Sequence, residues 1–312
     1  MHDTIYLKGI DSIMYSEVLQ ELNKKIEWSL EQKIDHTIGT IETFIYKTNK
    51  TPYISFSGGK DSTVLLDIAR RFINPDMKAV FCNTGNEYPE IVNFVKQTDN
   101  VTIIHPTKKI KDIIETYGFP LISKETSYKV FQARTTKSER LLDIRLTGGG
   151  GKIGKIPEKW KFLIDAPFQI SDRCCYYLKK KPFQKYEKET EELPIIGVMT
   201  SESRMRKMSY AKRGECNSFE TKIVTSYPLS IWTDKDIWDY IHKFNVPYCC
   251  LYDNEEVKRT GCMFCGFGAQ FKNECRFDVL KKEHERIFNI IMNYENNGIT
   301  YKEALEYIGI EI

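Results

Sequence analysis

The spacing of hydrophobic positions predicts a helical segment at the start of the chain. Between residues 16 and 47, apolar side chains recur at helical intervals while the opposite side of the segment is polar. The members of this stripe are Leu19, Leu22, Ile26 and Leu30. Residues 1–50 are therefore expected to form a helical preface that packs on the main domain.

From residue 51 to residue 107 the pattern alternates between short apolar runs and amphipathic runs. Strands are expected at residues 52–56, 78–82 and 101–105. One helix is expected to begin after Ser62 and another to cover residues 90–97. Strands separated by helices are typical of a parallel, doubly wound sheet. The predicted fold class is therefore α/β, with a mainly parallel sheet and a Rossmann-like nucleotide site beyond the carboxyl ends of the strands.

The regular pattern is lost between residues 124 and 169, which predicts a loop insertion in this domain. Four consecutive glycines at residues 148–151 are flanked by Arg145, Lys152 and Lys155. They indicate either a mobile basic loop or a solvated connector.

Regular elements return in the second half of the chain. A strand is expected at residues 193–199, and an amphipathic helix at residues 233–244, capped by Thr233 or Asp234. Its apolar stripe is expected to be core and consists of Ile237, Tyr240, Ile241 and Phe244. The division expected is a preface over residues 1–50, a nucleotide-binding domain over 51–248 and a C-terminal segment over 249–312.

Composition narrows the class of protein without choosing a function. The chain has 312 residues, 41% hydrophobic and 29% charged, which is ordinary for a globular protein with a sizeable core. The net charge of +3 does not by itself indicate a nucleic-acid partner. No stretch has the apolar length of a membrane span, and the first residues do not begin a secretory signal. We therefore expect a cytoplasmic location and no membrane partner.

A glycine-containing loop joins the first expected strand to the first expected helix of the domain. Its residues are Ser55, Ser57, Gly58, Gly59, Lys60, Asp61, Ser62 and Thr63. The glycines allow a close approach of the backbone to an anion, and the helix N-terminus favours negative charge. Lys60 adds a positive charge, and the spacing differs from that of a Walker P-loop. The loop predicts a nucleotide-phosphate site, with an ordinary glycine turn as the alternative.

Nine cysteines are unusual in a chain expected to occupy a reducing compartment, where disulfides are rare. An adjacent pair, Cys174 and Cys175, and a Cys-x-x-Cys, Cys262 and Cys265, are the expected metal ligands. No histidine lies near them in sequence, so all-thiolate ligation of a four-iron cluster fits well. Zinc and unliganded cysteines stay open as alternatives.

The remaining cysteines are weaker indications. Cys82 is expected to be core. The others are expected to be either inert or sulfur carriers or nucleophiles, and they are Cys216, Cys249, Cys250 and Cys275.

Several motifs in order resemble those of the phosphoadenosine-phosphosulfate reductase family, within the ATP-pyrophosphatase or adenine-nucleotide alpha-hydrolase superfamily. The resemblance covers about residues 51–268. Besides the glycine loop and the cysteines, it rests on the segments at residues 83–90, 173–182, 228–238 and 246–248. It implies that Thr84 and Gly85 contact the nucleotide and that the cysteines hold a [4Fe-4S] cluster.

The resemblance also implies roles for a basic segment at residues 202–207. The family has a Ser/Arg segment that contacts sulfate or phosphate at this place, which would assign that role to Arg204 and Arg206. An arginine fork can bond two oxyanion oxygens at once. The alternative is a solvated charged turn.

Two departures favour ATP chemistry over reduction. The reductases end in a cysteine-containing tail, whereas this chain has no cysteine after Cys275. Its glycine loop is intact, as in ATP-using relatives of the reductases. We therefore expect ATP, with Mg²⁺, to be cleaved at the alpha-phosphate so that an acceptor is adenylated and then receives sulfur. The residues expected to take part in the chemistry are Lys60, Ser62, Arg204, Arg206 and Cys275.

Two other functions stay open. One is a sulfonucleotide reductase acting on adenylylsulfate or phosphoadenylylsulfate, and the other is a non-catalytic nucleotide- and cluster-binding sensor. The partners to consider are a sulfur donor such as a cysteine desulfurase, a thioredoxin-like reductant, a nucleic-acid acceptor and a second copy of the chain. The tail at residues 271–312 has a helix-like apolar order that would close over the cluster or form a dimer contact.

Overall fold

A computed structural model of the protein describes residues 16–151, 154–220 and 223–312. The chain forms two compact units built from interleaved segments. The first unit holds the chain up to Phe81, then Glu90–Ile103 and Tyr186–Cys250, and the second holds Cys82–Pro89, Ile104–Lys185 and Leu251–Ile312. The expected division at residues 50 and 248 stays a prediction.

A six-stranded sheet with the order β3-β2-β1-β5-β7-β6 organises the first unit. The strands are β1 (Pro52–Ser55), β2 (Ala79–Cys82), β3 (Val101–Ile104), β5 (Leu193–Ile195), β6 (Asn217–Ser218) and β7 (Thr225–Ser226). β1 pairs in parallel with both β2 and β5, β5 pairs in parallel with β7, and β6–β7 is antiparallel. The predicted mainly parallel α/β fold is confirmed. From β1 the chain adds β2 and β3 on one side of the sheet and then returns to add β5 on the other side. The boundary between β1 and β5 is therefore the switch point, where doubly wound sheets bind ligands.

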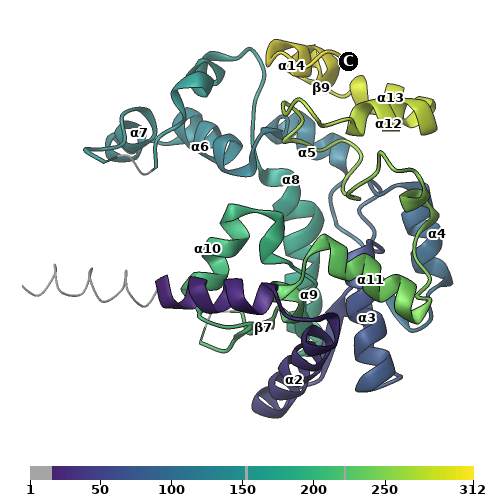
Figure 1. The fold of residues 1–312 in the computed structure, drawn as a ribbon. Helices are drawn as coiled ribbons and strands as arrows, with labels where there is room; N and C mark the ends of the chain where they lie inside the picture. The colour runs from purple at the N-terminus through teal and green to yellow at the C-terminus, as the bar shows by residue number, and fades with distance from the viewer. Residues whose placement is uncertain (1–15, 152–153, 221–222) are drawn as a thin grey trace, which may run out of the picture. The chain divides into compact units, whose positions relative to one another are not determined.

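Helices surround this sheet, and α2, α3 and α11 pack against one another (Figure 1). Their bounds are α2 (Leu30–Thr48), α3 (Lys60–Phe72), α4 (Pro89–Gln97), α9 (Lys181–Thr190), α10 (Arg204–Arg213) and α11 (Asp234–Phe244), with short 3₁₀ turns η3 (Thr200–Glu202), η4 (Pro228–Ile231) and η5 (Cys250–Asp253). Residues 16–26 are helical as well, while the start of the expected preface lies outside the described residues. The preface is broken at residues 27–29, because Ser29 caps α2 through a capping box with Gln32.

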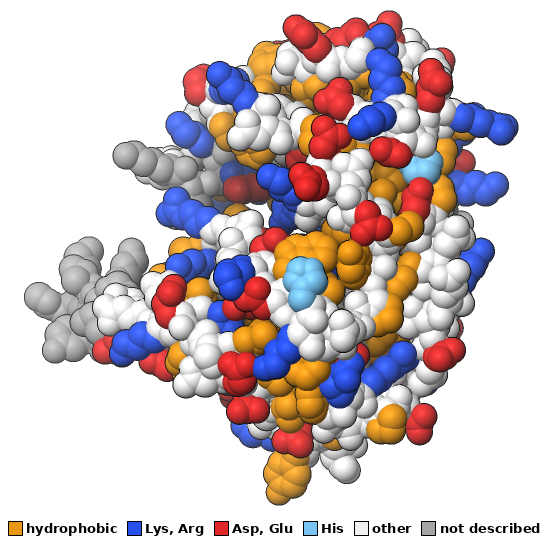
Figure 2. Space-filling view, turned by 45° about the vertical axis from the view of Figure 1, so that its right-hand side comes forward, with side chains coloured by type: hydrophobic (Ala, Val, Ile, Leu, Met, Phe, Trp, Pro, Cys, Tyr) orange, Lys and Arg blue, Asp and Glu red, His pale blue; other side chains and the backbone are white. Residues whose placement is uncertain are grey.

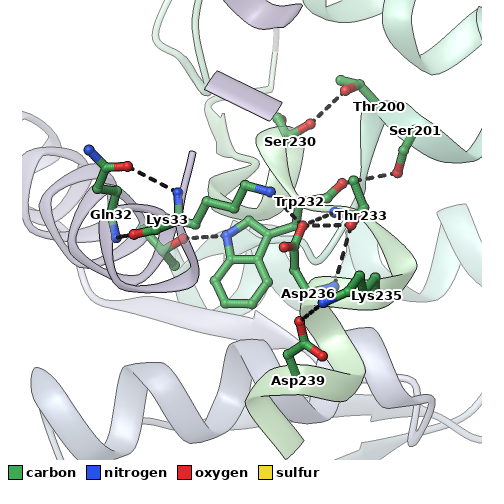
Figure 3. Close-up of polar contacts among 12 residues, drawn as sticks. Gln32, Lys33, Thr200, Ser201, Ser230, Trp232, Thr233, Lys235, Asp236 and Asp239 are labelled. Atoms are coloured by element: carbon green, nitrogen blue, oxygen red, sulfur yellow. Dashed lines mark hydrogen bonds and ion pairs between the residues drawn. The ribbon is translucent and has the colours of Figure 1, made fainter. Parts of the chain in front are cut away.

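The N-terminus of α11 is fixed by a buried polar network (Figure 3). Thr233 caps the helix through a capping box with Asp236. The Lys33 ammonium of α2 lies 2.6 Å from Asp236 Oδ2, and Trp232 Nε1 donates to Thr37 Oγ1 at 2.9 Å. The predicted cap is therefore confirmed, and the predicted core stripe is buried at Ile237, Tyr240 and Ile241.

The second unit contains helices that the hydrophobic pattern did not reveal. Its elements are α5 (Ile110–Tyr117), β4 (Leu121–Ile122), α6 (Lys124–Thr135), α7 (Glu139–Leu146), η1 (Glu158–Asp165), α8 (Arg173–Cys175), η2 (Tyr176–Lys180), β8 (Gly266–Phe267), α12 (Arg276–Glu283), α13 (Glu285–Met292), β9 (Glu295–Asn296), β10 (Ile299–Thr300) and α14 (Tyr301–Tyr307). The expectation of a loop over residues 124–169 is therefore wrong for most of that segment.

Capping residues explain why these helices form. Ser123 accepts the Thr126 N–H at the start of α6, and Ser138 accepts the Leu141 N–H at the start of α7. α7 contains no buried residue. Because no face of this helix is buried, its sequence lacks the apolar stripe by which a helix is predicted. In the glycine run, Gly151 N–H donates to the Gly148 carbonyl in a turn after α7, and Lys152 lies outside the described residues.

The expected helix-like tail is present as separate short helices. Phe277, Leu280 and Ile291 of its apolar series are buried, whereas Ile290 is exposed. Asn296 of the β9–β10 hairpin connects the tail to α5 by donating to the Ile114 carbonyl at 2.8 Å. The tail therefore contributes to the core of the second unit.

The surface seen in Figure 2 mixes charges of both signs, with small groups of apolar side chains between them. Throughout the described ranges, every helix is too short or too polar to cross a bilayer.

Candidate functional site

The glycine loop turns directly into α3 in a conformation that leaves the helix start uncapped by side chains. Gly59 is the N-cap and α3 begins at Lys60. A glycine cap has no side chain to accept the first N–H groups of the helix, so these can point at an anion. Gly58 has φ +72°, and a Cβ there would lie 2.9 Å from Cγ2 of both Ile91 and Val95. The position therefore requires glycine for backbone conformation and for space.

Hydroxyl groups hold the loop in this shape. Ser57 N–H donates to Ser62 Oγ at 3.1 Å, and Gly59 N–H donates to Ser57 Oγ at 3.3 Å. Ser62 Oγ in turn donates to the Gly59 carbonyl at 2.9 Å, as does Thr63 Oγ1 at 3.0 Å. Ser57, Ser62 and Thr63 thus hold the loop conformation, and their contact with a nucleotide stays a prediction.

Lys60 lies in this loop with its ammonium between two carboxylates. Its Nζ is 2.7 Å from Asp234 Oδ1 and 3.2 Å from Asp61 Oδ1. The Lys60 side chain is only 5% exposed, whereas that of Asp234 is 66% exposed. The sequence pattern indicated Asp234 only as a helix-capping residue. Asp234 and Asp61 therefore both neutralise the Lys60 ammonium.

The loop lies at the switch point of the sheet. It follows β1, and the segment after β5 approaches it so closely that a Cβ on Gly197 would lie 3.3 Å from the Asp61 carbonyl oxygen. That segment continues into α10, capped by Ser203. Arg204 is exposed at the start of α10, and Arg206 forms an ion pair with Glu202. The first unit therefore contains the loop and both expected arginines.

Thr84 and Gly85 belong to the second unit, in the segment after β2. The Thr84 hydroxyl donates to Glu87 Oε1 at 2.8 Å, and Gly85 N–H donates to Asn83 Oδ1 at 3.1 Å. Gly85 has φ +76°. In this structure their polar groups thus form a local turn, and their contact with a nucleotide stays a prediction.

The second unit gathers the four cysteines that were expected to be ligands. Cys174 and Cys175 end the short helix α8, which continues as the π-helical turn η2. In the Cys-x-x-Cys loop, Cys265 N–H donates to the Cys262 carbonyl at 3.0 Å. π-helical turns are frequent at functional sites.

Three anchors hold the Cys-x-x-Cys loop in place. Met263 N–H donates to the Asn86 carbonyl at 2.8 Å, and the buried Tyr301 hydroxyl donates to the Phe264 carbonyl at 2.7 Å. Directly after the loop, β8 pairs in parallel with β4. The loop geometry is therefore built by distant parts of the second unit.

The thiols share one electrostatic environment. Burial raises the pKa of Cys262 to about 12, with further contributions from Glu87, Cys265 and Cys175. Cys174 has a raised pKa because it hydrogen-bonds to the Cys175 sulfur and is buried, and the other thiols add to this shift. The same hydrogen bond, helped by Lys124 and Lys179, lowers the pKa of Cys175 below its ordinary value. Cys175 is therefore the thiol of this set that most readily becomes a thiolate.

Two further residues of this environment were not expected from the sequence. Cys82, at the end of β2, donates its thiol to the Leu178 carbonyl at 3.2 Å, and burial raises its pKa to about 12. The electrostatic interaction with Cys262 raises the pKa of Lys179. Cys82 had been interpreted as a core residue, and it is indeed buried.

The four cysteines expected to be ligands lie in one electrostatic environment. Cys174, Cys175, Cys262 and Cys265 influence one another's pKa, and Lys179 supplies compensating positive charge. Within the part of the chain that the structure describes, no three His, Cys, Asp or Glu side chains converge to hold a metal ion. Ligation of a metal or cluster by these four cysteines therefore stays a prediction.

Cys275, the expected nucleophile, lies at the N-cap of α12. Its thiol is partly exposed and donates to the Glu256 carbonyl at 3.7 Å. The neighbouring Arg276 donates to the Cys265 carbonyl at 3.0 Å and pairs with Glu274. The structure thus connects Arg276 to the Cys-x-x-Cys loop, and the role of Cys275 stays a prediction.

A glycine loop at the switch point of a doubly wound sheet defines a nucleotide-binding α/β protein. Comparison with known proteins assigns the chain further: it belongs to the phosphoadenosine phosphosulfate reductase domain family, whose model matches residues 51–141 and 150–266. The expected family is confirmed.

Individual relatives are distant. The chain is 25% identical over 271 residues to an uncharacterised protein of Methanocaldococcus jannaschii, covering 84% of this chain and 46% of that protein, so it spans about half its length. It is 24% identical over 260 residues to the adenosine 5'-phosphosulfate reductase of Staphylococcus haemolyticus, covering 82% of this chain and 81% of the relative. It is 25% identical over 225 residues to sulfate adenylyltransferase subunit 2 of Allorhizobium ampelinum, covering 68% of this chain and 61% of the relative.

Proposed function

We propose that the chain is an enzyme of sulfur metabolism that binds ATP on the glycine loop and cleaves it at the alpha-phosphate. The observation that carries this proposal is the start of α3, where Gly58 and Gly59 leave the first helical N–H groups uncapped beside the buried Lys60. Uncapped amides and an ammonium favour the charge of a leaving pyrophosphate. The named relatives include an enzyme of sulfate adenylylation, which supports nucleotide chemistry of this kind.

In the proposed reaction an acceptor oxygen attacks the alpha-phosphorus. The bond to the bridging oxygen of the beta-phosphate breaks, and pyrophosphate leaves with the electron pair. Lys60 would offset the charge that develops on it, with Mg²⁺ bound to the phosphates as the expected co-reactant. Arg204 and Arg206 would bind oxyanion oxygens of the nucleotide or acceptor. A sulfur nucleophile at the oxidation level of sulfide then displaces AMP from the acceptor, with no net redox change.

Cys174, Cys175, Cys262 and Cys265 would hold a [4Fe-4S] cluster in this proposal. Their all-thiol chemistry suits iron–sulfur ligation. When bound, such a cluster supplies iron that can bind sulfur or carry electrons. Around it, Lys179 would offset the negative charge of the thiolates, and the Asn86 and Tyr301 contacts would keep the Cys-x-x-Cys loop in position.

A sulfonucleotide reductase is the second candidate. It is favoured by the similarity to an adenosine 5'-phosphosulfate reductase over 82% of this chain. In that reaction a thiolate attacks the sulfur of adenylylsulfate, AMP leaves, and a second thiol releases sulfite with formation of a disulfide. Cys275 is the candidate thiol because it is partly exposed.

One experiment separates the two functions. Anaerobically purified protein is given ATP in one series, and adenylylsulfate or phosphoadenylylsulfate with a thiol donor in the other. The proposal predicts pyrophosphate from ATP in the presence of acceptor and no sulfite from the sulfonucleotides. Sulfite release that Cys275→Ser abolishes would establish the reductase instead. Tight nucleotide binding without either product would indicate a sensor.

A further inference from the structure

The positive charge of this chain is concentrated in one segment of the second unit. Residues 104–185 contain eighteen Lys and Arg against eight Asp and Glu, a net charge of +10, within a chain whose net charge is +3. The rest of the chain is therefore acidic. Such an asymmetry is typical of a protein that binds a polyanion through one part of its surface.

Three tyrosines of this segment form an aromatic surface. The rings of Tyr117 and Tyr177 stack with centroids 5.3 Å apart and an interplanar angle of 22°, and their hydroxyl groups hydrogen-bond at 2.8 Å. Tyr176 packs edge-on against Tyr177 at 5.1 Å. The Tyr176 side chain is 39% exposed, so part of its ring is accessible from solvent.

Two lysines border the same rings. Lys108 Nζ lies 5.1 Å from the Tyr177 centroid and 5.7 Å from that of Tyr117, and Lys181 Nζ lies 5.9 Å from the Tyr177 centroid. We call these five residues, Tyr117, Tyr176, Tyr177, Lys108 and Lys181, the tyrosine platform. These ammonium groups contact aromatic rings, which carry no net charge to neutralise them.

The platform continues toward α6 and lies next to the cysteines in the chain. Phe131 of α6 packs against Tyr117 at 6.5 Å, and the Arg173 guanidinium lies 4.9 Å from the Phe131 ring centroid. Arg173 directly precedes Cys174, and Tyr176 directly follows Cys175. The same short turn therefore presents a candidate ligand and an exposed aromatic ring.

We propose that the tyrosine platform binds a single-stranded segment of nucleic acid, with a base stacked on Tyr176 and phosphates near Lys108 and Lys181. Aromatic rings bordered by cations are the recurring means of binding single strands, because every base has a π-face and every linkage has a charge. This inference rests on the proposed function and specifies its acceptor, since it would bring a nucleotide base beside Cys175. The alternative occupant is an acidic protein, which would use the lysines without needing the exposed ring.

Binding is measured by fluorescence anisotropy with labelled oligonucleotides of about 16 nucleotides, the upper end of single-strand site sizes. RNA and DNA of one sequence are compared as single strands and as duplexes, in the absence of ATP. Tyr176→Ala is expected to weaken single-strand binding about tenfold. The matched control is Tyr46→Ala, which removes a tyrosine that is 87% exposed on α2 and should leave affinity unchanged.

Salt dependence tests the charge contribution. Lys181→Ala should reduce the slope of log affinity against log salt by about 0.7 between about 50 and 200 mM salt. Preference for RNA or for DNA identifies the source of the strand, and either result supports the platform. The proposal would be overturned if Tyr176→Ala bound the single strand as tightly as wild type does. It would also be overturned if polyglutamate displaced the labelled strand as effectively as an unlabelled single strand does. Because no ATP is present, oligonucleotide binding is measured independently of pyrophosphate release. Failure of the tyrosine platform to bind a strand therefore does not imply failure of the proposed ATP cleavage, and the reverse also holds.

Discussion

At the residue scale, the loop combines a backbone cradle with a lysine that is already paired. The uncapped first turn of α3 favours an anion, while Asp234 and Asp61 occupy the Lys60 ammonium at 2.7 and 3.2 Å. An arriving phosphate would share or replace these carboxylates. The ion pairs with Asp234 and Asp61 thus fix the position of the Lys60 ammonium.

The conformation of Gly58 can be tested by a single added methyl group. Gly58→Ala should destabilise the first unit by about 1–3 kcal/mol, because its Cβ would meet Ile91 and Val95 at 2.9 Å and its φ is positive. The measurement is urea unfolding. Gly39→Ala, at an exposed position within α2 with nothing near its Cβ, is the control and should stabilise by about 0.5–1 kcal/mol. Equal effects of the two substitutions would contradict the account of Gly58.

The loop could be predicted from the sequence because its residue types and spacing carry the chemistry locally. The ion pair between Asp234 and Lys60 could not be predicted, because it joins residues that are far apart in the chain. Cys82 was likewise interpreted as core, and only the folded chain brings it into the environment of Cys262 and Glu87. Long-range pairing, not residue type, is what the sequence left undetermined at this scale.

At the element scale, α11 presents Asp234 because its N-terminus is anchored to α2. The Lys33 side chain is 3% exposed and its ammonium lies 2.6 Å from Asp236. Lys33→Met would leave the Asp236 carboxylate buried without this partner, at a cost of about 3–5 kcal/mol. Urea unfolding of Lys33→Met, Asp236→Asn and the double variant measures the coupling. Additive effects of the two substitutions would show that the pair is not coupled.

The packing of α2 should also make stability depend on pH. Burial lowers the pKa of His36 from its ordinary value of 6.5, and the imidazole lies 3.7 Å from the Cys216 sulfur. The unfolded chain then binds a proton below pH 6.5 that the folded chain resists, so stability is full above this pH and falls as the solution is acidified. The slope is at most about 1.4 kcal/mol per pH unit.

Thermal unfolding of wild type and His36→Gln across this pH range measures the contribution. The variant should lose part of the acid sensitivity. An unchanged pH profile in His36→Gln would assign the sensitivity to other groups.

Elements with strong periodicity were predictable, and elements defined by caps were not. The first three strands, α3 and α11 lie close to where the pattern placed them, although α3 begins at Lys60 rather than after Ser62. β1, β2, α3 and α11 each bury apolar side chains, whereas no residue of β3 is buried. The strand expected at residues 193–199 is shorter, Leu193–Ile195, because the chain leaves the sheet for the loop at the switch point. α6 and α7 escaped prediction because Ser123 and Ser138 define their starts while their apolar positions are irregular.

At the scale of the whole molecule, the chain divides its chemistry between two units. The first holds the glycine loop and the basic segment at residues 202–207, and the second holds Cys174, Cys175, Cys262, Cys265 and the tyrosine platform. Each unit can therefore be tested by a readout of its own.

For the second unit, anaerobic reconstitution with iron and sulfide should yield about four irons per chain. Cys262→Ser is expected to lose most of this iron and the visible absorption of the cluster. Cys250→Ser, which changes an exposed cysteine of the first unit, should retain both. Zinc in the purified protein and no uptake of iron would support the structural zinc alternative.

The central claim is that the glycine loop binds the phosphates of an adenine nucleotide, and isothermal titration with Mg-ATP tests it most directly. Wild type should bind, with pyrophosphate as a competitor, and Lys60→Ala should weaken binding about 10- to 100-fold because it removes a charged hydrogen-bond donor. Lys96→Ala, on the exposed surface of α4, is the matched control and should bind as wild type does. Equal affinity of Lys60→Ala and wild type, or no competition by pyrophosphate, would contradict the account.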